Sequence, residues 1–399
     1  MAFAPSSLIL TNYFLPLSEA LYFFTPVVIT WKNEVKGFMK LVLTCILVLG
    51  ILLAYPCNAE STRTEEVVVQ LNQYLKELAA KNSFSGSVLL AKGENILVQE
   101  AYGMASKRFN VPNNVETKFN LASMNKMFTS VAILQLVESG KLSLSDKLSK
   151  FLDESWLPKS ISSEIEIKHL LSHSSGLDHY FNKTYRNTSK SNYQTLEDYK
   201  SLVVNGPVLF KAGTKSQYSN TGMLVLGVVI EKVSGKDYYS YIRENIYQKA
   251  GMVNSDSYEL DQPIFNLATG YDPNKNNSTG WQNNNFMFVF KGTPDGGGFS
   301  TVQDLHKFAL ALTNNKLLGK EFTEQAFTIQ SKLRYFDYGY GFTIRGDSDN
   351  RIVGHGGAFP GIGSNLDIYR EQGYIAVVLS NYGRGDREVR NKIRELLKK

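Results

Sequence analysis

Residues 121–137 constrain the fold most, because the apolar residues of this stretch would leave no broad polar face on a helix. A helix that lacks a broad polar face has to be buried on all sides. Gly140 follows the last apolar position and is a helix stop signal. The stretch therefore predicts a helix at the centre of its domain, with these apolar residues: Met127, Phe128, Val131, Ala132, Ile133, Leu134, Leu136 and Val137.

Ser123 and Lys126 stand one helical turn apart at the start of this stretch, so they share one face of the predicted helix. A serine hydroxyl becomes a strong nucleophile when a base takes its proton, and a desolvated lysine can be that base. The spacing is also a signature of serine acyl-transfer enzymes. The alternative is that Ser123 only caps the helix, and the spacing alone does not decide, because Ser-x-x-Lys is expected about once by chance in such a chain.

Tyr218 and Asn220 form a second polar pair, just before another apolar helical stretch at residues 223–232. A phenol and a carboxamide two residues apart can face one cavity from a loop. The same spacing also occurs within residues 178–199, which are rich in Tyr, Asn, Ser and Lys. We predict that residues 178–199 are an irregular insertion near the surface, so that only the Tyr218 pair is functional.

His355 lies in a glycine-rich segment that is followed by residues 364–369 and 374–381, two strands around a Gly-containing turn that predict a hairpin. Gly356 and Gly357 would let a ligand approach the backbone of an edge strand. Near the other end of the chain, residues 86–91 and 95–99 flank a Lys-Gly-Glu turn and predict a hairpin. Helical patterns at residues 62–81 and 386–399 precede and follow these strands.

The charge balance is mild, with 43 basic against 37 acidic residues and a net charge of +6. Without a dense run of Lys or Arg, this composition does not predict a nucleic-acid partner. The five histidines show no metal-ligand pattern, so we predict no metal and no cofactor. His173 is a candidate base, but we favour a structural histidine at a helix end.

The N-terminal segment resembles a leader. Residues 39–59 have a basic start, an apolar run and small residues at the end, which predicts a signal peptide. The apolar run is shorter than the roughly 20 residues of a membrane span. The alternative is an uncleaved anchor that associates the protein with the membrane. We expect residues 1–38 to be an over-extended N-terminus, and residues 60–399 to form one hydrolase domain without cysteine, because Cys45 and Cys57 both lie in the leader.

Taken in order, the pairs Ser123/Lys126 and Tyr218/Asn220 and the triplet at His355 resemble the three motifs of one family. This is the class C β-lactamase / D-alanyl-D-alanine carboxypeptidase family of penicillin-recognising serine hydrolases. Residues 84–91, 170–177, 296–301 and 355–361 are similar to stretches of the same family, and the resemblance extends from about residue 62 to the C-terminus.

The resemblance implies an α/β (α+β) fold of the β-lactamase/transpeptidase type. An antiparallel sheet would be flanked on one face by the first and last helices. A large, mainly helical region at residues 110–315 would cover the other face, with the site at the seam.

The resemblance also implies roles for the motif residues. Ser123 would form an acyl-enzyme, while Lys126 and Tyr218 would carry protons. Asn220 would bind the acyl-side amide of the substrate. The backbone N–H groups of Ser123 and Ala358 would form the oxyanion hole, and His355, Gly356 and Gly357 would lie along the substrate.

One departure from the family pattern bears on the substrate. Typical class C β-lactamases have Lys-Thr-Gly where this chain has His355, Gly356 and Gly357. A histidine with an ordinary pKa of about 6.5 is mostly neutral at pH 7, so the fixed positive charge is lost.

We therefore expect an exported, periplasmic or extracellular hydrolase of the D-Ala-D-Ala carboxypeptidase-like peptidase/amidase or esterase kind. Its substrate would be a small molecule, peptide or ester, with peptidoglycan as one candidate. One alternative is a class C-type β-lactamase. Another is a non-catalytic relative that binds peptidoglycan or a protein partner, which is disfavoured because Ser123, Lys126, Tyr218 and Asn220 are all present.

Overall fold

The computed structural model describes residues 61–287 and 289–398. The predicted leader at residues 39–59 and the over-extended segment before it lie outside the described residues. Residues Glu66–Lys399 form one compact unit. Across the ranges described, no helix has both the length and the apolar character that a membrane span requires.

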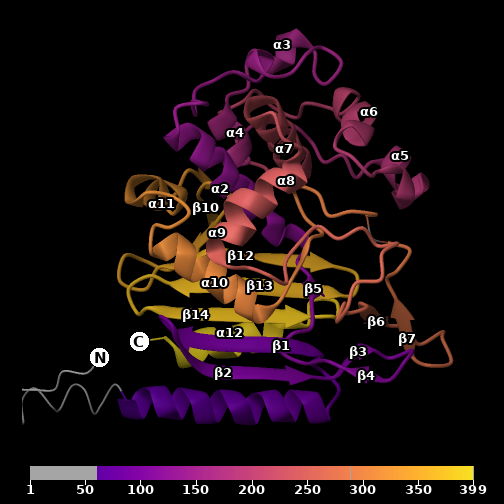
Figure 1. The fold of residues 1–399 in the computed structure, drawn as a ribbon, viewed down its shortest axis with the longest axis vertical. Helices are drawn as coiled ribbons and strands as arrows, with labels where there is room; N and C mark the ends of the chain where they lie inside the picture. The colour runs from indigo at the N-terminus through magenta and orange to yellow at the C-terminus, as the bar shows by residue number, and fades with distance from the viewer. Residues whose placement is uncertain (1–60, 288, 399) are drawn as a thin grey trace, which may run out of the picture. The chain divides into compact units, whose positions relative to one another are not determined.

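The unit is built on one antiparallel sheet in the order β2-β1-β14-β13-β12-β11-β10-β9 (Figure 1). Both predicted hairpins are confirmed, and β1 pairs with β14, which joins strands from opposite ends of the chain. The three short strands at the β9 edge were not predicted. The strands of this sheet are β1 (Gly86–Lys92), β2 (Asn95–Tyr102), β9 (Ser331–Lys332), β10 (Asp337–Tyr338), β11 (Thr343–Arg345), β12 (Ile352–Phe359), β13 (Ile362–Tyr369) and β14 (Tyr374–Ser380).

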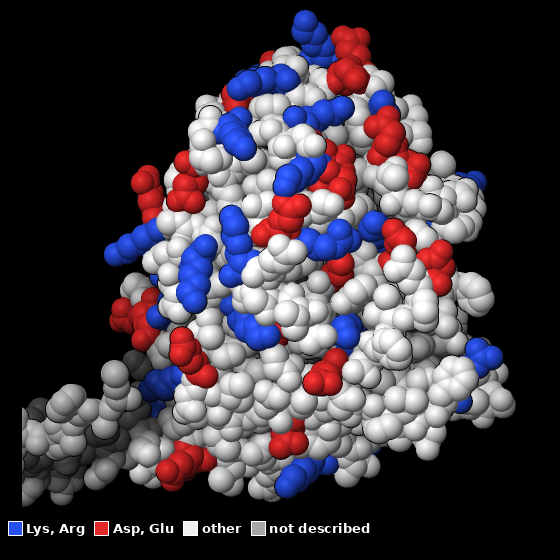
Figure 2. Space-filling view, in the orientation of Figure 1, with Lys and Arg blue, Asp and Glu red and all other residues white. Residues whose placement is uncertain are grey.

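Helical residues 66–80 and helix α12 (Asp386–Leu396) pack on one face of the sheet, as predicted. Side chains alternate along a strand, so Val88 and Leu90 of β1 face these helices while Leu89 faces the opposite core. Acidic and basic side chains are interspersed over the face of the molecule in Figure 2, as the mild net charge suggests.

The other face of the sheet carries the helical region, with α2 (Asn125–Glu138) at its centre. The prediction that this helix is buried on all sides is confirmed, because every residue from Asn125 to Leu134 is buried. The Phe128 ring packs edge-on against Phe308 and Tyr247, at 4.9 and 5.3 Å between ring centroids. Helix α7 (Asn220–Ser234) lies against α2.

Shorter elements connect these layers. They are β3 (Met104–Ser106), β4 (Val111–Pro112), β5 (Phe119–Asn120), η1 (Ala122–Met124), η2 (Leu148–Lys150), α3 (Lys159–Ser162), α4 (Ile167–Leu171), α5 (Lys183–Asn187), η3 (Lys190–Asn192), η4 (Glu197–Tyr199), α6 (Lys200–Val204), α8 (Tyr238–Ile242), η5 (Arg243–Tyr247), α9 (Gln248–Ala250), β6 (Tyr271–Pro273), β7 (Trp281–Asn283), β8 (Phe299–Ser300), α10 (Val302–Thr313) and α11 (Lys320–Ala326).

The prediction of an irregular surface insertion at residues 178–199 is wrong for its aromatic residues. Tyr180, Tyr185, Tyr193 and Tyr199 are buried, and neighbouring rings among them lie 4.8–5.3 Å apart. Tyrosine carries a large apolar surface as well as a hydroxyl, so these rings form a local core while most of the Asn, Ser and Lys residues between them are exposed.

Candidate active site

Ser123 lies in the 3-10 turn η1, directly before α2. The preceding residue, Ala122, has a left-handed backbone with φ of 43°, a conformation that costs free energy in a residue with a Cβ. Two hydrogen bonds hold it: the Ala122 N–H donates to Asn120 Oδ1 (2.9 Å) and its carbonyl accepts from the Gly297 N–H (3.1 Å). Such strain is typical of a turn that must present one side chain in a fixed direction.

The structure brings Lys126 to Ser123, as the motif predicts. Lys126 is fully buried, and its Nζ donates to Ser123 Oγ (3.2 Å) and to the Asp295 carbonyl oxygen (2.5 Å). Burial lowers the pKa of the Lys126 ammonium to about 8, against the opposing effect of the Asp295 carboxylate. A substantial fraction of Lys126 is therefore neutral near pH 8 and able to accept a proton.

Tyr218 completes the group, with its ring centroid 4.9 Å from Lys126 Nζ. Burial raises the pKa of the Tyr218 phenol, and a hydrogen bond with Ser123 only partly offsets the increase. Tyr218 consequently keeps its proton at neutral pH, which suits a proton donor better than a tyrosinate base.

His173 positions the Tyr218 loop, in line with the structural role that we favoured. Its Nδ1 accepts from the Ser219 N–H (3.2 Å), its carbonyl accepts from the Gln217 N–H (2.9 Å), and its ring centroid lies 4.3 Å from that of Tyr218. Burial holds the pKa of His173 well below its ordinary value, so the ring stays neutral.

Asn220 is the first residue of α7 and lines the pocket beside Ser123. Its backbone N–H donates to His179 Nδ1 (3.3 Å). Within the described residues, its side-chain Oδ1 is buried and has no hydrogen-bond partner. Since buried polar atoms are normally paired, this atom is available to a donor group on a substrate.

The third motif lies on β12, and its members do not share one role. The His355 side chain is absent from the pocket lining: its Nε2 is 3.1 Å from the Tyr338 hydroxyl and its Nδ1 is 2.7 Å from the Gly356 carbonyl oxygen. Burial lowers the pKa of His355 to about 3, so it supplies no positive charge. Ala358 does line the pocket.

Gly356 and Gly357 are outside the pocket lining. A Cβ at Gly357 would lie 2.2 Å from the Leu121 carbonyl oxygen. Gly357 thus permits the close approach of β12 to the turn that carries Ser123.

The pocket itself has a volume of about 120 Å³. Among the described residues that line it, Asp295 has the one ionisable carboxylate and no Lys or Arg is present. The lining residues are Asn120, Ala122, Ser123, Tyr180, Phe181, Tyr185, Asn220, Met287, Val289, Thr293, Asp295, Gly296, Gly297, Ala358, Phe359 and Ile362.

Asp295 is a site residue that the sequence patterns did not reveal. Its carboxylate accepts from the Tyr180 hydroxyl (3.0 and 3.2 Å to the two oxygens) and from Thr293 Oγ1 (2.8 Å). Burial raises the pKa of Asp295, while the Lys126 charge and the two hydroxyls act to lower it. The sequence feature that could have pointed to Asp295 is its position directly before the glycine run at residues 296–298.

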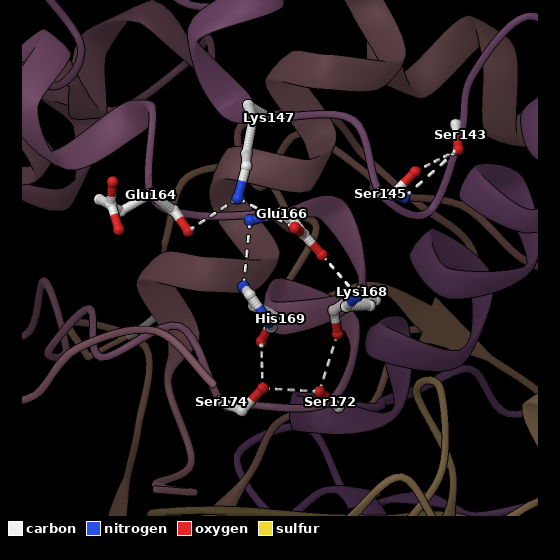
Figure 3. Close-up of polar contacts among 9 residues, drawn as sticks. All are labelled: Ser143, Ser145, Lys147, Glu164, Glu166, Lys168, His169, Ser172 and Ser174. Carbon is white, nitrogen blue, oxygen red and sulfur yellow. Dashed lines mark hydrogen bonds and ion pairs between the residues drawn. The ribbon is translucent and has the colours of Figure 1, made fainter. Parts of the chain in front are cut away.

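An ion cluster anchors the start of α4, the helix that leads to His173 (Figure 3). Glu166 binds Lys147 (2.9 Å) and Lys168 (2.5 Å), and its backbone N–H donates to His169 Nδ1 (3.1 Å). His169 therefore serves as a helix cap. In the part of the chain that the structure describes, no three His, Cys, Asp or Glu side chains are grouped to hold a metal ion.

Comparisons with known proteins agree with this architecture. The model of the Beta-lactamase family matches residues 71–398. The chain is 30% identical to penicillin-binding protein 4* of Bacillus subtilis over 328 residues, which cover 78% of this chain and 71% of the relative. It is 28% identical to the teichoic acid D-alanine hydrolase of Staphylococcus aureus over 330 residues, or 81% of this chain and 75% of the relative.

A solved structure shows the same fold. The penicillin-binding protein from Bacillus halodurans superposes with a TM-score of 0.74 at 31% sequence identity, over 81% of this chain and 100% of the other. The chain therefore belongs to the Beta-lactamase family and is a serine hydrolase of the penicillin-recognising kind.

Proposed function

We propose that this protein hydrolyses small amides or esters through an acyl-enzyme on Ser123. The observation that carries the proposal is the buried Lys126 Nζ at 3.2 Å from Ser123 Oγ, with its pKa lowered to about 8. A lysine in this position can take the serine proton near neutral pH.

The lowered pKa of Lys126 and the raised pKa of Tyr218 suggest the path of the proton. Neutral Lys126 accepts the Ser123 proton as Oγ attacks the substrate carbonyl, and the backbone N–H groups of Ser123 and Ala358 stabilise the oxyanion. Tyr218, which stays protonated, gives its proton to the departing amine or alcohol and recovers one from Lys126. Water then attacks the acyl-enzyme, and the same groups return a proton to Ser123 Oγ.

The pocket favours substrates without a carboxylate next to the reacting carbonyl. His355 is neutral, and the described residues that line the pocket include the carboxylate of Asp295 but no Lys or Arg that could attract a carboxylate. β-Lactams and D-Ala-D-Ala peptides bear such a carboxylate, so an amidase or esterase fits this pocket better than a class C-type β-lactamase or a D,D-carboxypeptidase. The name of the Staphylococcus aureus relative, teichoic acid D-alanine hydrolase, supports a substrate with a small acyl group.

We also propose that the protein is exported and acts in the cell envelope. The proposal rests on the leader expected at residues 39–59 and on relatives named for penicillin binding and teichoic acid.

Hydrolysis of D-alaninamide and of ethyl esters of small acids, by the protein and by its Ser123→Ala variant, tests the proposal. We expect acid release that requires Ser123. Intact-mass measurements with a penicillin are run in parallel. Ser123-dependent destruction of the penicillin would favour the β-lactamase, a lasting adduct would favour the carboxypeptidase, and inactivity in every assay would favour the non-catalytic relative.

A further inference from the structure

Asp295 is a buried carboxylate beside the nucleophile that the proposed proton path does not use. We propose that Asp295, together with Asn220 Oδ1, binds the ammonium group of an α-aminoacyl substrate. The proposal rests on the function proposed above and names its substrate class: amides or esters of amino acids with a free amino group.

The hydrogen bonds of Asp295 leave room for a ligand. Asp295 is only 4% exposed, and the two side chains that donate hydrogen bonds to its carboxylate carry neutral hydroxyls, Tyr180 and Thr293. Asp295 Oδ1 accepts from both the Tyr180 and the Thr293 hydroxyl, whereas Oδ2 accepts only from the Tyr180 hydroxyl. A carboxylate has about four acceptor positions, so the second oxygen can accept from an ammonium.

The charge balance of the site also favours a bound cation. Lys126 is the cation that acts on Asp295, but its Nζ bonds the Asp295 backbone carbonyl rather than the carboxylate. Lys126 must moreover be neutral before it can accept the serine proton. At that stage no other cation of the described residues acts on Asp295, and burial favours either protonation of the carboxyl or the binding of a cation from outside the protein. A substrate ammonium would supply the missing charge.

The other walls of the pocket suit a small cation. Asn220 Oδ1 is a buried acceptor with no partner in the described residues. Tyr180, Phe181 and Tyr185 line the same pocket, and aromatic rings attract ammonium groups. The volume of about 120 Å³ is enough for a short acyl group such as alanyl.

A purely structural role for Asp295 is the competing explanation. The carboxylate joins Tyr180 to the loop that contains Thr293, so its removal could simply loosen the loop. Thr293→Val is the matched control because it removes a neutral donor from the same cluster and leaves the charge of Asp295 in place.

The test compares ethyl D-alaninate with ethyl propionate and ethyl N-acetyl-D-alaninate at pH 7, for the protein, Asp295→Asn and Thr293→Val. The measured quantity is the ratio of kcat/KM for the alaninate to kcat/KM for each amine-free ester. Comparing this ratio between variants cancels the intrinsic reactivity of the esters. We expect Asp295→Asn to lower the ratio by about tenfold to a hundredfold, as for a lost hydrogen bond to a charged group. Thr293→Val should leave the ratio within about threefold.

A binding measurement separates this inference from the proposed function. In the Ser123→Ala background, calorimetry should show D-alaninamide binding more tightly than propionamide, with the difference removed by Asp295→Asn. An equal ratio in the protein and Asp295→Asn, or equal losses on all esters in both variants, would overturn the ammonium subsite. Failure of every ester to be hydrolysed, with preferential binding of D-alaninamide intact, would instead refute only the catalytic proposal.

Discussion

The Nε2 atom of His355 lies 3.1 Å from the hydroxyl oxygen of Tyr338, and the His355 ring also packs beside Tyr218, 6.3 Å between ring centroids. The imidazole at the family's lysine position is therefore a buried, neutral part of a ring cluster. The His355 ring packs beside Tyr218, the proposed proton donor, and does not attract an anionic substrate.

Replacing His355 tests this interpretation. His355→Lys should lower the free energy of unfolding by about 3 kcal/mol, because a buried ammonium without a carboxylate partner loses its hydration. It should not create penicillin turnover. His355→Gln, which stays neutral, should unfold closer to the parent in urea titrations. A His355→Lys protein of parental stability that destroys penicillin would contradict the interpretation.

The pH dependence of kcat/KM for an ester without an amino group should report Lys126. Its pKa is lowered to about 8, and the neutral form is the active one. Activity should thus rise about tenfold per pH unit below pH 8 and level off above it. Lys126→Arg, which stays protonated at all these pH values, should be inactive although folded. A flat profile between pH 6 and pH 9 would argue against Lys126 as the base.

Loss of the Tyr218 hydroxyl should affect amides more than activated esters. The raised pKa makes Tyr218 a proton donor at neutral pH, and an amine cannot leave without a proton whereas a phenolate can. Tyr218→Phe should lower kcat/KM for an amide by about 10²–10⁴ and for a phenyl ester much less. Equal losses on both substrates would indicate that the phenol acts in the attack step instead.

The Glu166 cluster should make stability depend on pH in the acid range. Lys168 and Lys147 lower the pKa of Glu166 from 4.5 to about 2. The stabilisation is then fully present above pH 4.5 and is lost as the pH falls towards 2. Because the Lys147 and Lys168 side chains are 44% and 45% exposed, screening reduces the contribution to about 1 kcal/mol.

Urea titrations of Glu166→Gln should therefore show a loss of about 1 kcal/mol at pH 7 and almost none near pH 2. Salt should shrink the difference at pH 7, because partly exposed charges are screened. A difference that persists unchanged at pH 2 would mean that packing, rather than charge, explains the effect.

The sequence predicts the parts of this protein that local patterns determine. The apolar helix after Ser123 and the hairpins at both ends follow from periodicity. The motif order predicts that Ser123, Lys126 and Tyr218 meet. By contrast, β9 and β10 have only two residues each, which is too few for an alternating pattern. They form by pairing at the edge of the large sheet.

The least predictable features depend on contacts between distant residues. Asp295 accepts a hydrogen bond from Tyr180, which is 115 positions earlier in the chain. The glycine run after Asp295 does not indicate this partner, and no local pattern marks Tyr180. The tyrosines near Tyr180 looked exposed because polar residues separate them. Their burial depends on a local cluster of rings that periodicity along one segment does not reveal.

The two glycines that follow His355 offer a matched pair for the geometry of the site. A Cβ at Gly357 would lie 2.2 Å from the Leu121 carbonyl oxygen, whereas one at Gly356 would lie 3.3 Å from the Ser364 carbonyl oxygen. Gly357→Ala must push β12 away from the turn that holds Ser123, and a displacement of about 1 Å can cost a hundredfold in rate. We expect kcat/KM to fall about that much for Gly357→Ala and only a few-fold for Gly356→Ala. Equal activities would show that the spacing between β12 and Ser123 tolerates a methyl group, and that the oxyanion site does not depend on this close approach.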